Sequence, residues 1–229
     1  MKIGILGCGN MGRTLGWLWS QAGHSVTLAS GRPDKSSQLA SQMGARSGDY
    51  AHTVAESEVL LYTLRKVPPT HLVAERSLFH GKVVIDCNQE DIPLQFDFRP
   101  QSQSLAQWLA GELPLSQVVK AFNLHPVELY QHGPERLREW GVQSFFCSDF
   151  PEARVVVRQL AQDLGLTPFD CGSLSRAHLL ESQANFARLF QLEQGQALVS
   201  QFQLVGFPEP PEGALGGRQP GYVPDQELS

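Results

Sequence analysis

The chain has 229 residues and a formal net charge of −5, and this mild acidity makes it a poor electrostatic match for nucleic acid or anionic lipid. Hydrophobic residues amount to 41% and charged residues to 18%, a balance typical of a globular core and not of a disordered chain. No apolar run approaches the ~20 residues that cross a bilayer, and the sequence opens on a strand-like segment where a signal peptide would stand. We therefore expect a cytoplasmic protein with no nucleic-acid or membrane partner.

The cysteines predict no metal site. No two of them form a C-x-x-C pair, and no histidine stands close enough to complete a set of zinc ligands. We interpret them as small buried residues in a reducing compartment, and we expect no bound metal. They are Cys8, Cys87, Cys147 and Cys171.

Strands and helices alternate along the first part of the chain. Apolar runs rich in branched residues predict strands over residues 2–6, 25–29, 58–63 and 82–86. Helical spacing of apolar residues and suitable end signals predict helices over 11–21, 34–43 and 69–78. This order predicts a Rossmann-type α/β fold, a doubly wound and mostly parallel sheet with helices on both faces.

The second half of the chain continues the pattern with more interruptions. Residues 89–103 are polar and hold two prolines, so we expect a loop there. Further helices are predicted over 104–109, 134–140 and 151–164, and further strands over 117–122, 144–147 and 167–171. We expect a Rossmann domain over 1–174, a C-terminal helical extension over 175–205, and a tail over 206–229, rich in Pro and Gly, that is flexible or wraps over a partner.

A glycine-rich loop follows the first strand and opens the first helix. Gly7, Gly9 and Gly12 fit the pattern G-x-G-x-x-G, with Asn10 and Met11 between the last two glycines. In this context Gly7 permits the tight turn, Gly9 lets a pyrophosphate approach the backbone, and Gly12 lets helix and strand pack closely. The free N–H groups at the helix start then favour phosphate. The alternative is a glycine turn with no ligand.

The end of the second strand predicts which dinucleotide binds. An NAD-specific site usually has Asp or Glu at this point, and the run 30–35 has no acid at the strand tip. Ser30, Arg32 and Lys35 offer instead a hydroxyl, a planar fork and a point charge, which suit a 2′-phosphate. The alternative is a solvated helix start, although cations in a first turn run against the helix dipole. We predict NADPH over NADH.

Four segments resemble one family, the NADPH-dependent reductases that include the coenzyme F420:NADP oxidoreductases and the reductase domains of the six-helix membrane metalloreductases. The resemblance covers residues 1 to about 200. The last two segments are more specific to this family than the glycine loop is. The segments are the loop 7–12 with Asn10-Met11, the S-x-R run 30–32, the run VVKAFN over 118–123, and DCGSL over 170–174 followed by Leu180-Glu181-Ser182.

The resemblance implies a nicotinamide site at the ends of three further strands, where ligands of open α/β sheets sit. It also implies a homodimer and a small-molecule acceptor, F420 or a flavin, stacked on the nicotinamide near Asn123, Leu124 and His125. The implied cofactor-binding residues are Thr63, Leu64, Asn88, Ala121, Phe122 and Asn123.

His125 is the candidate catalytic residue. The ordinary pKa of histidine suits proton delivery to the acceptor, and the alternative is a loop histidine with a structural hydrogen bond. The sequence departs from the family at Leu64-Arg65-Lys66, where a proline is common, and near the family's C-terminal arginine, where Arg176 and His178 stand. These departures lie on the acceptor side, so the identity of the acceptor stays open.

Two classes of function remain. The first is an NADP(H)-dependent oxidoreductase that transfers hydride between NADP(H) and a flavin-like or other small acceptor. The second is a catalytically idle NADP(H)-binding sensor or regulatory subunit. An imine or β-hydroxyacid reductase is disfavoured because those relatives usually need a large helical second domain, and the stretch 175–205 is too short for one and holds no lysine.

Overall fold

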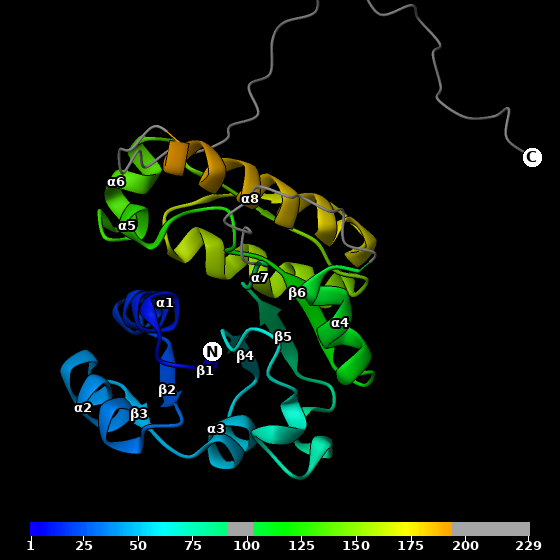
Figure 1. Cartoon of the computed structure of the whole chain (residues 1–229). Helices are drawn as coiled ribbons and strands as arrows, with labels where there is room; N and C mark the ends of the chain where they lie inside the picture. The colour runs from blue at the N-terminus through cyan, green and yellow to red at the C-terminus, as the bar shows by residue number, and fades with distance from the viewer. Residues whose placement is uncertain (91–102, 194–229) are drawn as a thin grey trace, which may run out of the picture.

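The computed structural model describes residues 1–90 and 103–193. Six parallel strands form one sheet in the order β3-β2-β1-β4-β5-β6, which is the doubly wound order with β1 at the switch point (Figure 1). The three central strands are buried almost throughout, as expected where helices cover both faces. The strands are β1 (Lys2–Leu6), β2 (Ser25–Ala29), β3 (Arg46–Ser47), β4 (Val59–Tyr62), β5 (Val83–Asp86) and β6 (Gln117–Lys120).

Helices cover the sheet on both faces, and each face has its own apolar core. Helices α1 (Asn10–Gln21), α2 (Pro33–Met43) and α7 (Pro151–Asp163) pack on one face around Trp19 and Leu160. Helices α3 (Tyr50–Glu56), α4 (Leu105–Glu112) and α8 (Ala177–Glu193) pack on the other. The predicted Rossmann-type fold with a C-terminal helix is confirmed.

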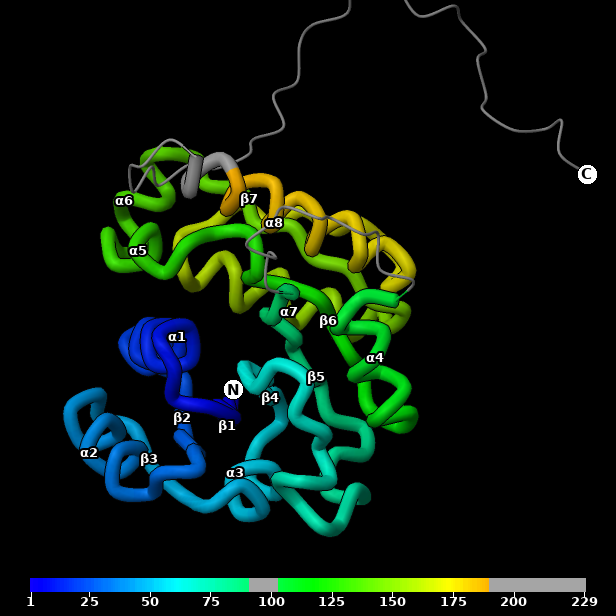
Figure 2. The backbone as a smooth tube through the Cα atoms, in the orientation of Figure 1, coloured from blue at the N-terminus to red at the C-terminus, as the bar shows by residue number. Residues whose placement is uncertain are grey.

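The chain after β6 builds a smaller layer that carries α8. Strands β7 (Gln143–Phe146) and β8 (Thr167–Asp170) pair in parallel as a separate sheet, and a single antiparallel bridge from Lys120 to Cys147 joins it to β6. Short helices α5 (Val127–Tyr130) and α6 (Gly133–Glu139) connect β6 to β7, and η3 (Leu174–Arg176) leads into α8. Helix α8 follows this layer in the sequence, and in Figure 2 it lies above α1.

The structure differs from the sequence prediction in four places. The helix predicted over 69–78 is instead two short 3-10 helices, η1 (Pro69–His71) and η2 (Arg76–Phe79). The backbone is extended at Glu75, which separates them. The strand predicted over 117–122 ends at Lys120. Elements α3, with Asp49 as its N-cap, and β3 were not predicted, and neither was α5. The tail 206–229, most of the loop 89–103 and the helical stretch after residue 193 lie outside the described residues.

Within residues 1–90 and 103–193, no helix combines the length and the apolar composition that crossing a bilayer requires.

Candidate dinucleotide-binding site

The glycine loop between β1 and α1 has three glycines that are needed for different reasons. Gly7 has φ +109°, a conformation that L side chains rarely adopt. A Cβ on Gly12 would lie 2.1 Å from the carbonyl oxygen of Gly7, so this glycine permits the close packing of helix and strand. A Cβ on Gly9 would meet nothing within 4 Å. The fold itself therefore does not require Gly9, and the open space in front of it fits a ligand that approaches the backbone.

The first turn of α1 borders a cleft of about 520 Å³. Gly9 is the N-cap of this helix and supplies no side-chain cap, so the early N–H groups of α1 are left for a ligand. Residues 9–12 all line the cleft. Thr63 also lines it, and its single hydroxyl proton is shared between the carbonyls of Leu6 and Gly7, each 3.0 Å from Oγ1, which fixes the loop to the end of β1.

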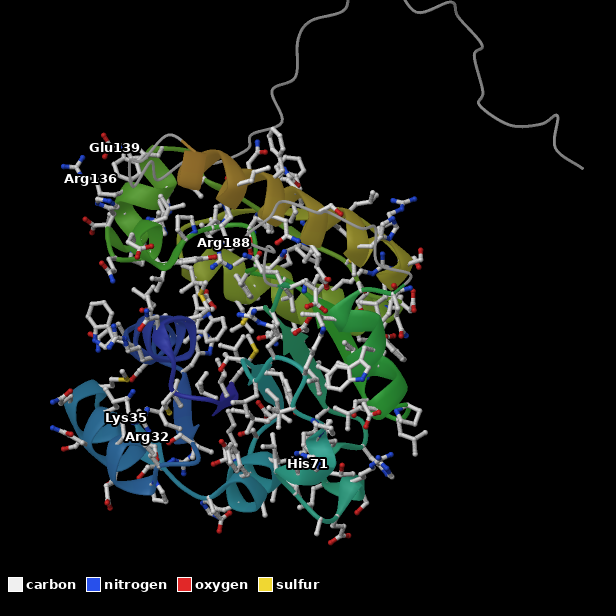
Figure 3. The ribbon with its side chains drawn as sticks, in the orientation of Figure 1. Arg32, Lys35, His71, Arg136, Glu139 and Arg188 are labelled. Atoms are coloured by element: carbon white, nitrogen blue, oxygen red, sulfur yellow. The ribbon has the colours of Figure 1, made fainter. Side chains whose placement is uncertain are left out.

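The predicted 2′-phosphate residues lie together at the start of α2. The hydroxyl of Ser30 donates to the carbonyl of Arg32 at 2.8 Å and accepts from its N–H at 3.2 Å, which closes a tight turn after β2. Arg32 is exposed at the N-cap of α2, and Lys35 is half-buried in the first turn of that helix (Figure 3). Burial raises the pKa of the Cys8 thiol, and Ser30 and Lys35 oppose that shift, so both stand beside the glycine loop. Ser30, Arg32 and Lys35 do not line the cleft itself.

The other end of the cleft is formed by strand ends, as predicted. Thr63, Asn88, Asn123 and His125 line it, together with Leu124. Three predicted residues do not line it, namely Leu64, Ala121 and Phe122. Ala121 and Phe122 are buried, and the Phe122 ring packs edge-on against Trp19 with ring centroids 5.6 Å apart.

A second group of residues that line the cleft was not predicted from the sequence. Some of them stand within a few residues of the strand ends that the resemblance implies, where ligands of open α/β sheets sit. The residues of α8 come from more than 50 positions further along the chain, and no sequence pattern pointed to them. Those near the strand ends are Arg65, Cys87, Gln89, Pro126, Val127 and Glu128, and those on α8 are Ala184, Ala187 and Arg188.

Two buried amide oxygens in the cleft lack a hydrogen-bond partner among the described residues. Asn123 donates through Nδ2 to the carbonyl of Leu180 at 3.0 Å, whereas its Oδ1 accepts nothing there. Gln89 Oε1 likewise accepts no hydrogen bond from the described residues. Buried acceptors are rarely left unpaired, so these two atoms suit a ligand that donates hydrogen bonds. The carboxamide of a nicotinamide ring is such a donor.

His125 is buried, and its environment differs from the one predicted. Desolvation by burial lowers its pKa to about 4, and the backbone at Gln143 only partly opposes this. Its Nδ1 lies 3.4 Å from the hydroxyl of Tyr130. The expectation of an ordinary histidine pKa was wrong, because the ring is held neutral at physiological pH by its apolar surroundings.

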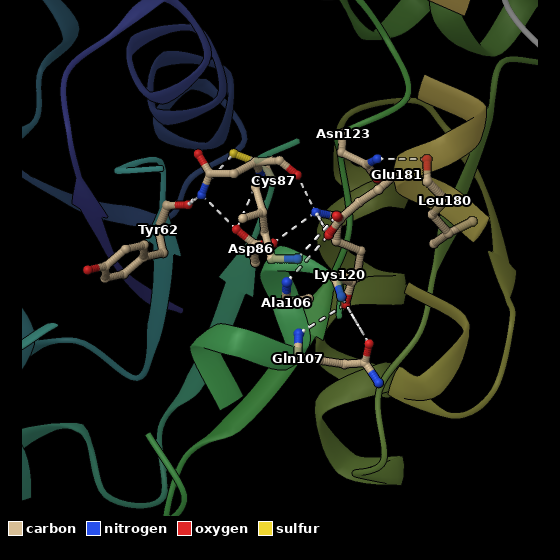
Figure 4. Close-up of polar contacts among 12 residues, drawn as sticks. Tyr62, Asp86, Cys87, Ala106, Gln107, Lys120, Asn123, Leu180 and Glu181 are labelled. Atoms are coloured by element: carbon tan, nitrogen blue, oxygen red, sulfur yellow. Dashed lines mark hydrogen bonds and ion pairs between the residues drawn. The ribbon is translucent and has the colours of Figure 1, made fainter. Parts of the chain in front are cut away.

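Three charged side chains are buried together directly behind the strand-end residues (Figure 4). Lys120 Nζ lies 2.8 Å from Asp86 Oδ2 and 2.7 Å from Glu181 Oε1. The exposed fractions of these side chains are 0%, 2% and 7% respectively. Burial alone would lower the pKa of Lys120, but the two carboxylates outweigh it and the pKa is raised. We call these three residues the buried charge cluster.

Arg176 and His178, which stand near the position of the family's C-terminal arginine, are exposed where η3 leads into α8. Arg176 Nη1 donates to the carbonyl of Cys171 at 2.7 Å, and His178 Nδ1 lies 2.7 Å from the carbonyl of Ser175. Neither lines the cleft, so the structure does not bring them to the predicted acceptor side.

Comparison with known proteins identifies the relatives of this chain. Residues 2–90 match the family described as NADP oxidoreductase, coenzyme F420-dependent. The metalloreductase STEAP3 of Rattus norvegicus is 30% identical over 181 residues, covering 79% of this chain and 36% of that protein. The metalloreductase STEAP2 of Homo sapiens is 28% identical over 203 residues, covering 87% of this chain and 39% of that protein. The chain thus spans little more than a third of the length of these relatives.

A solved structure shares the fold. The putative F420-dependent NADP reductase of Arthrobacter sp. FB24 aligns with a TM-score of 0.76 and 20% identity, over 90% of this chain and 100% of that one. The predicted family resemblance is confirmed. Because the matched family consists of NADP oxidoreductases, the comparisons support NADP(H) as the dinucleotide and an oxidoreductase as the class of enzyme.

Proposed function

We propose that this chain binds NADP(H) across the carboxyl edge of its sheet and transfers hydride between the nicotinamide and a flavin-like acceptor, F420 or a flavin, or another small acceptor. One observation carries the proposal. A single cleft runs from the open backbone at Gly9 to the unpaired oxygen of Asn123, so it offers a pyrophosphate site and a carboxamide site in one continuous space.

Each end of the dinucleotide has its own residues in this proposal. The N–H groups of residues 10–12 hold the pyrophosphate at the start of α1. Ser30, Arg32 and Lys35 hold the 2′-phosphate through a hydroxyl, a guanidinium and an ammonium. Asn88 and Asn123 orient the nicotinamide, because both are fixed by hydrogen bonds to the protein. Asn88 Nδ2 donates to the carbonyl of Tyr62 at 2.8 Å and to Asp86 Oδ1 at 2.6 Å.

The acceptor occupies the part of the cleft beside α8. Ala184 and Ala187 are small and leave room for a planar ring to lie against the nicotinamide. Bound NADPH supplies the hydride, so the protein mainly has to align the two rings and exclude water. His125 is placed to contact the acceptor, and since it is neutral it would act there as a hydrogen-bonding group rather than as a charged acid.

Oxidation of NADPH by the full chain, followed by the loss of absorbance of the reduced nicotinamide, tests the proposal. The acceptors are F420, FMN, FAD, a ferric chelate and a quinone, and NADH in place of NADPH is the control. Turnover with one acceptor is expected and would identify the substrate class. Tight NADPH binding without turnover on any acceptor would favour the sensor or regulatory subunit instead.

The homodimer and the cytoplasmic location stay predictions. Light scattering at micromolar concentration tests the first, and a mass of one chain would contradict it.

A further inference from the structure

The buried charge cluster does not balance its own charge. Two carboxylates, Asp86 and Glu181, face the single ammonium of Lys120, so the cluster carries one negative charge in excess. In a buried environment the field of such a charge reaches further than it does in water. A buried charge without a counter-charge costs free energy. A cationic group bound nearby would offset that cost.

Backbone donors stabilise the cluster without neutralising it. Glu181 accepts hydrogen bonds from the N–H groups of Leu105 at 3.1 Å and Ala106 at 3.4 Å, the first two residues of α4. The start of a helix carries roughly half a unit of positive charge, which compensates part of the excess. Asp86 accepts from the backbone N–H of Asn88 at 3.2 Å. These donors fix both carboxylates in place.

The cluster lies directly against the nicotinamide end of the cleft. The carbonyl of Asn88 accepts a hydrogen bond from Lys120 Nζ, and the side chain of Asn88 bonds Asp86, so this cleft residue touches two of the three charges. On the other side, Asn123 bonds the carbonyl of Leu180, the residue before Glu181. Asn88 and Asn123 both line the cleft, so a ring held by them lies one residue away from the excess charge.

The two states of the cofactor differ in charge at this point, because the oxidised nicotinamide ring is cationic and the reduced ring is neutral. We propose that the buried charge cluster sets the relative affinity of the cleft for the two states, stabilising NADP⁺ against NADPH and so favouring departure of hydride from the bound cofactor. This inference rests on the proposed function, since it requires NADP(H) in the cleft.

The test compares the dissociation constants of NADP⁺ and NADPH for the wild-type chain and for Glu181→Gln. Glutamine keeps an oxygen for the N–H groups of α4 and removes the excess charge. We expect the ratio of the NADP⁺ constant to the NADPH constant to rise about threefold to tenfold. A purely structural role would weaken both cofactors together and leave this ratio unchanged. Asp86→Asn makes the same change of charge at the end of β5 and should move the ratio in the same direction.

Two further variants serve as controls. Glu181→Asp keeps the charge on a shorter arm, so it should keep the wild-type ratio even if both affinities fall. Glu139→Gln makes the same change of net charge in an exposed ion pair on α6, where Arg136 Nη1 lies 2.6 Å from Glu139 Oε2, and should also keep it.

An unchanged ratio in Glu181→Gln and Asp86→Asn, with both cofactors still bound, would overturn the inference and leave the proposed function standing. A wild-type chain that binds neither cofactor would overturn the proposed function, and the inference with it.

Discussion

The two ends of the cleft are built in different ways. The end proposed for the 2′-phosphate and pyrophosphate comes from residues 7–35, and its cations stand at the start of α2, where Arg32 is exposed and Lys35 is half-buried. The end proposed for the nicotinamide comes from residues 63–188, and its charges Asp86, Lys120 and Glu181 are buried. The exposed Arg32 at the first end can bind an anion without supporting the fold, whereas the buried charges of the second end hold β5, β6, α4 and α8 together. Replacing Arg32 should therefore change binding more than stability, and replacing Lys120 should change stability most.

The largest effect on stability is expected from Lys120→Met. Removing this ammonium takes away the cation that both buried carboxylates share, and we expect a loss of about 3–5 kcal/mol in the free energy of unfolding. The matched control is Lys66→Met. Lys66 Nζ pairs with Glu90 Oε1 at 2.7 Å, but its side chain is 61% exposed, so the loss should stay below about 1 kcal/mol. Urea denaturation measures both, and equal losses would contradict a structural role for the buried charge cluster.

Two glycines of the same loop separate folding from binding. Gly12→Ala places its Cβ against the backbone of Gly7, and we expect a loss of about 3 kcal/mol in stability. Gly9→Ala meets no atom, so stability should change by less than about 0.5 kcal/mol. NADPH affinity should nevertheless fall in Gly9→Ala, because the methyl group occupies the approach to the backbone. Thermal unfolding measures the stabilities, and a titration measures the affinity for NADPH. An unchanged affinity in Gly9→Ala would contradict a pyrophosphate site at this loop.

His125 predicts a dependence of stability on pH. Its pKa is about 4 in the folded chain and about 6.5 when unfolded, so the unfolded state takes up the proton first as pH falls. Stability should therefore be lost as pH falls from about 6.5 to about 4, by about 3 kcal/mol in all. His125→Gln removes this contribution, so its stability should fall less than that of the wild type over the same range. Parallel losses in urea denaturation at pH 7 and pH 4.5 would show that His125 is not held neutral.

Arg32→Ala should have the smallest effect on stability and act on binding alone. Arg32 is exposed and stands at the start of α2, so stability should stay within about 0.5 kcal/mol. Loss of its charge-assisted hydrogen bonds should weaken NADPH about tenfold to a hundredfold. NADH, which has no 2′-phosphate, should be unaffected. The control is Arg136→Ala, an exposed arginine on α6 paired with Glu139. A fall in NADH affinity as large as that for NADPH would argue against a 2′-phosphate site.

The two ends of the cleft also differ in how far the sequence predicts them. The glycine loop and Ser30 to Lys35 are local patterns, and the alternation of strands and helices was enough to predict the sheet. Thr63, Asn88 and Asn123 were implied by the family resemblance, and their places at strand ends agree with where ligands of open α/β sheets sit. The ion pairs of Lys120 with Asp86 and Glu181 join residues 34 and 61 positions apart, and no periodicity records such contacts. The 3-10 helices near Pro69 and the short helix α3 depend on single turns and caps, which composition predicts poorly.

The most direct test of the account is a titration of the wild-type chain with NADPH and with NADH under the same conditions. We predict that NADPH binds at least about tenfold more tightly, because Arg32 and Lys35 at the start of α2 meet the 2′-phosphate. Equal affinities, tighter binding of NADH, or no binding of either dinucleotide would contradict it.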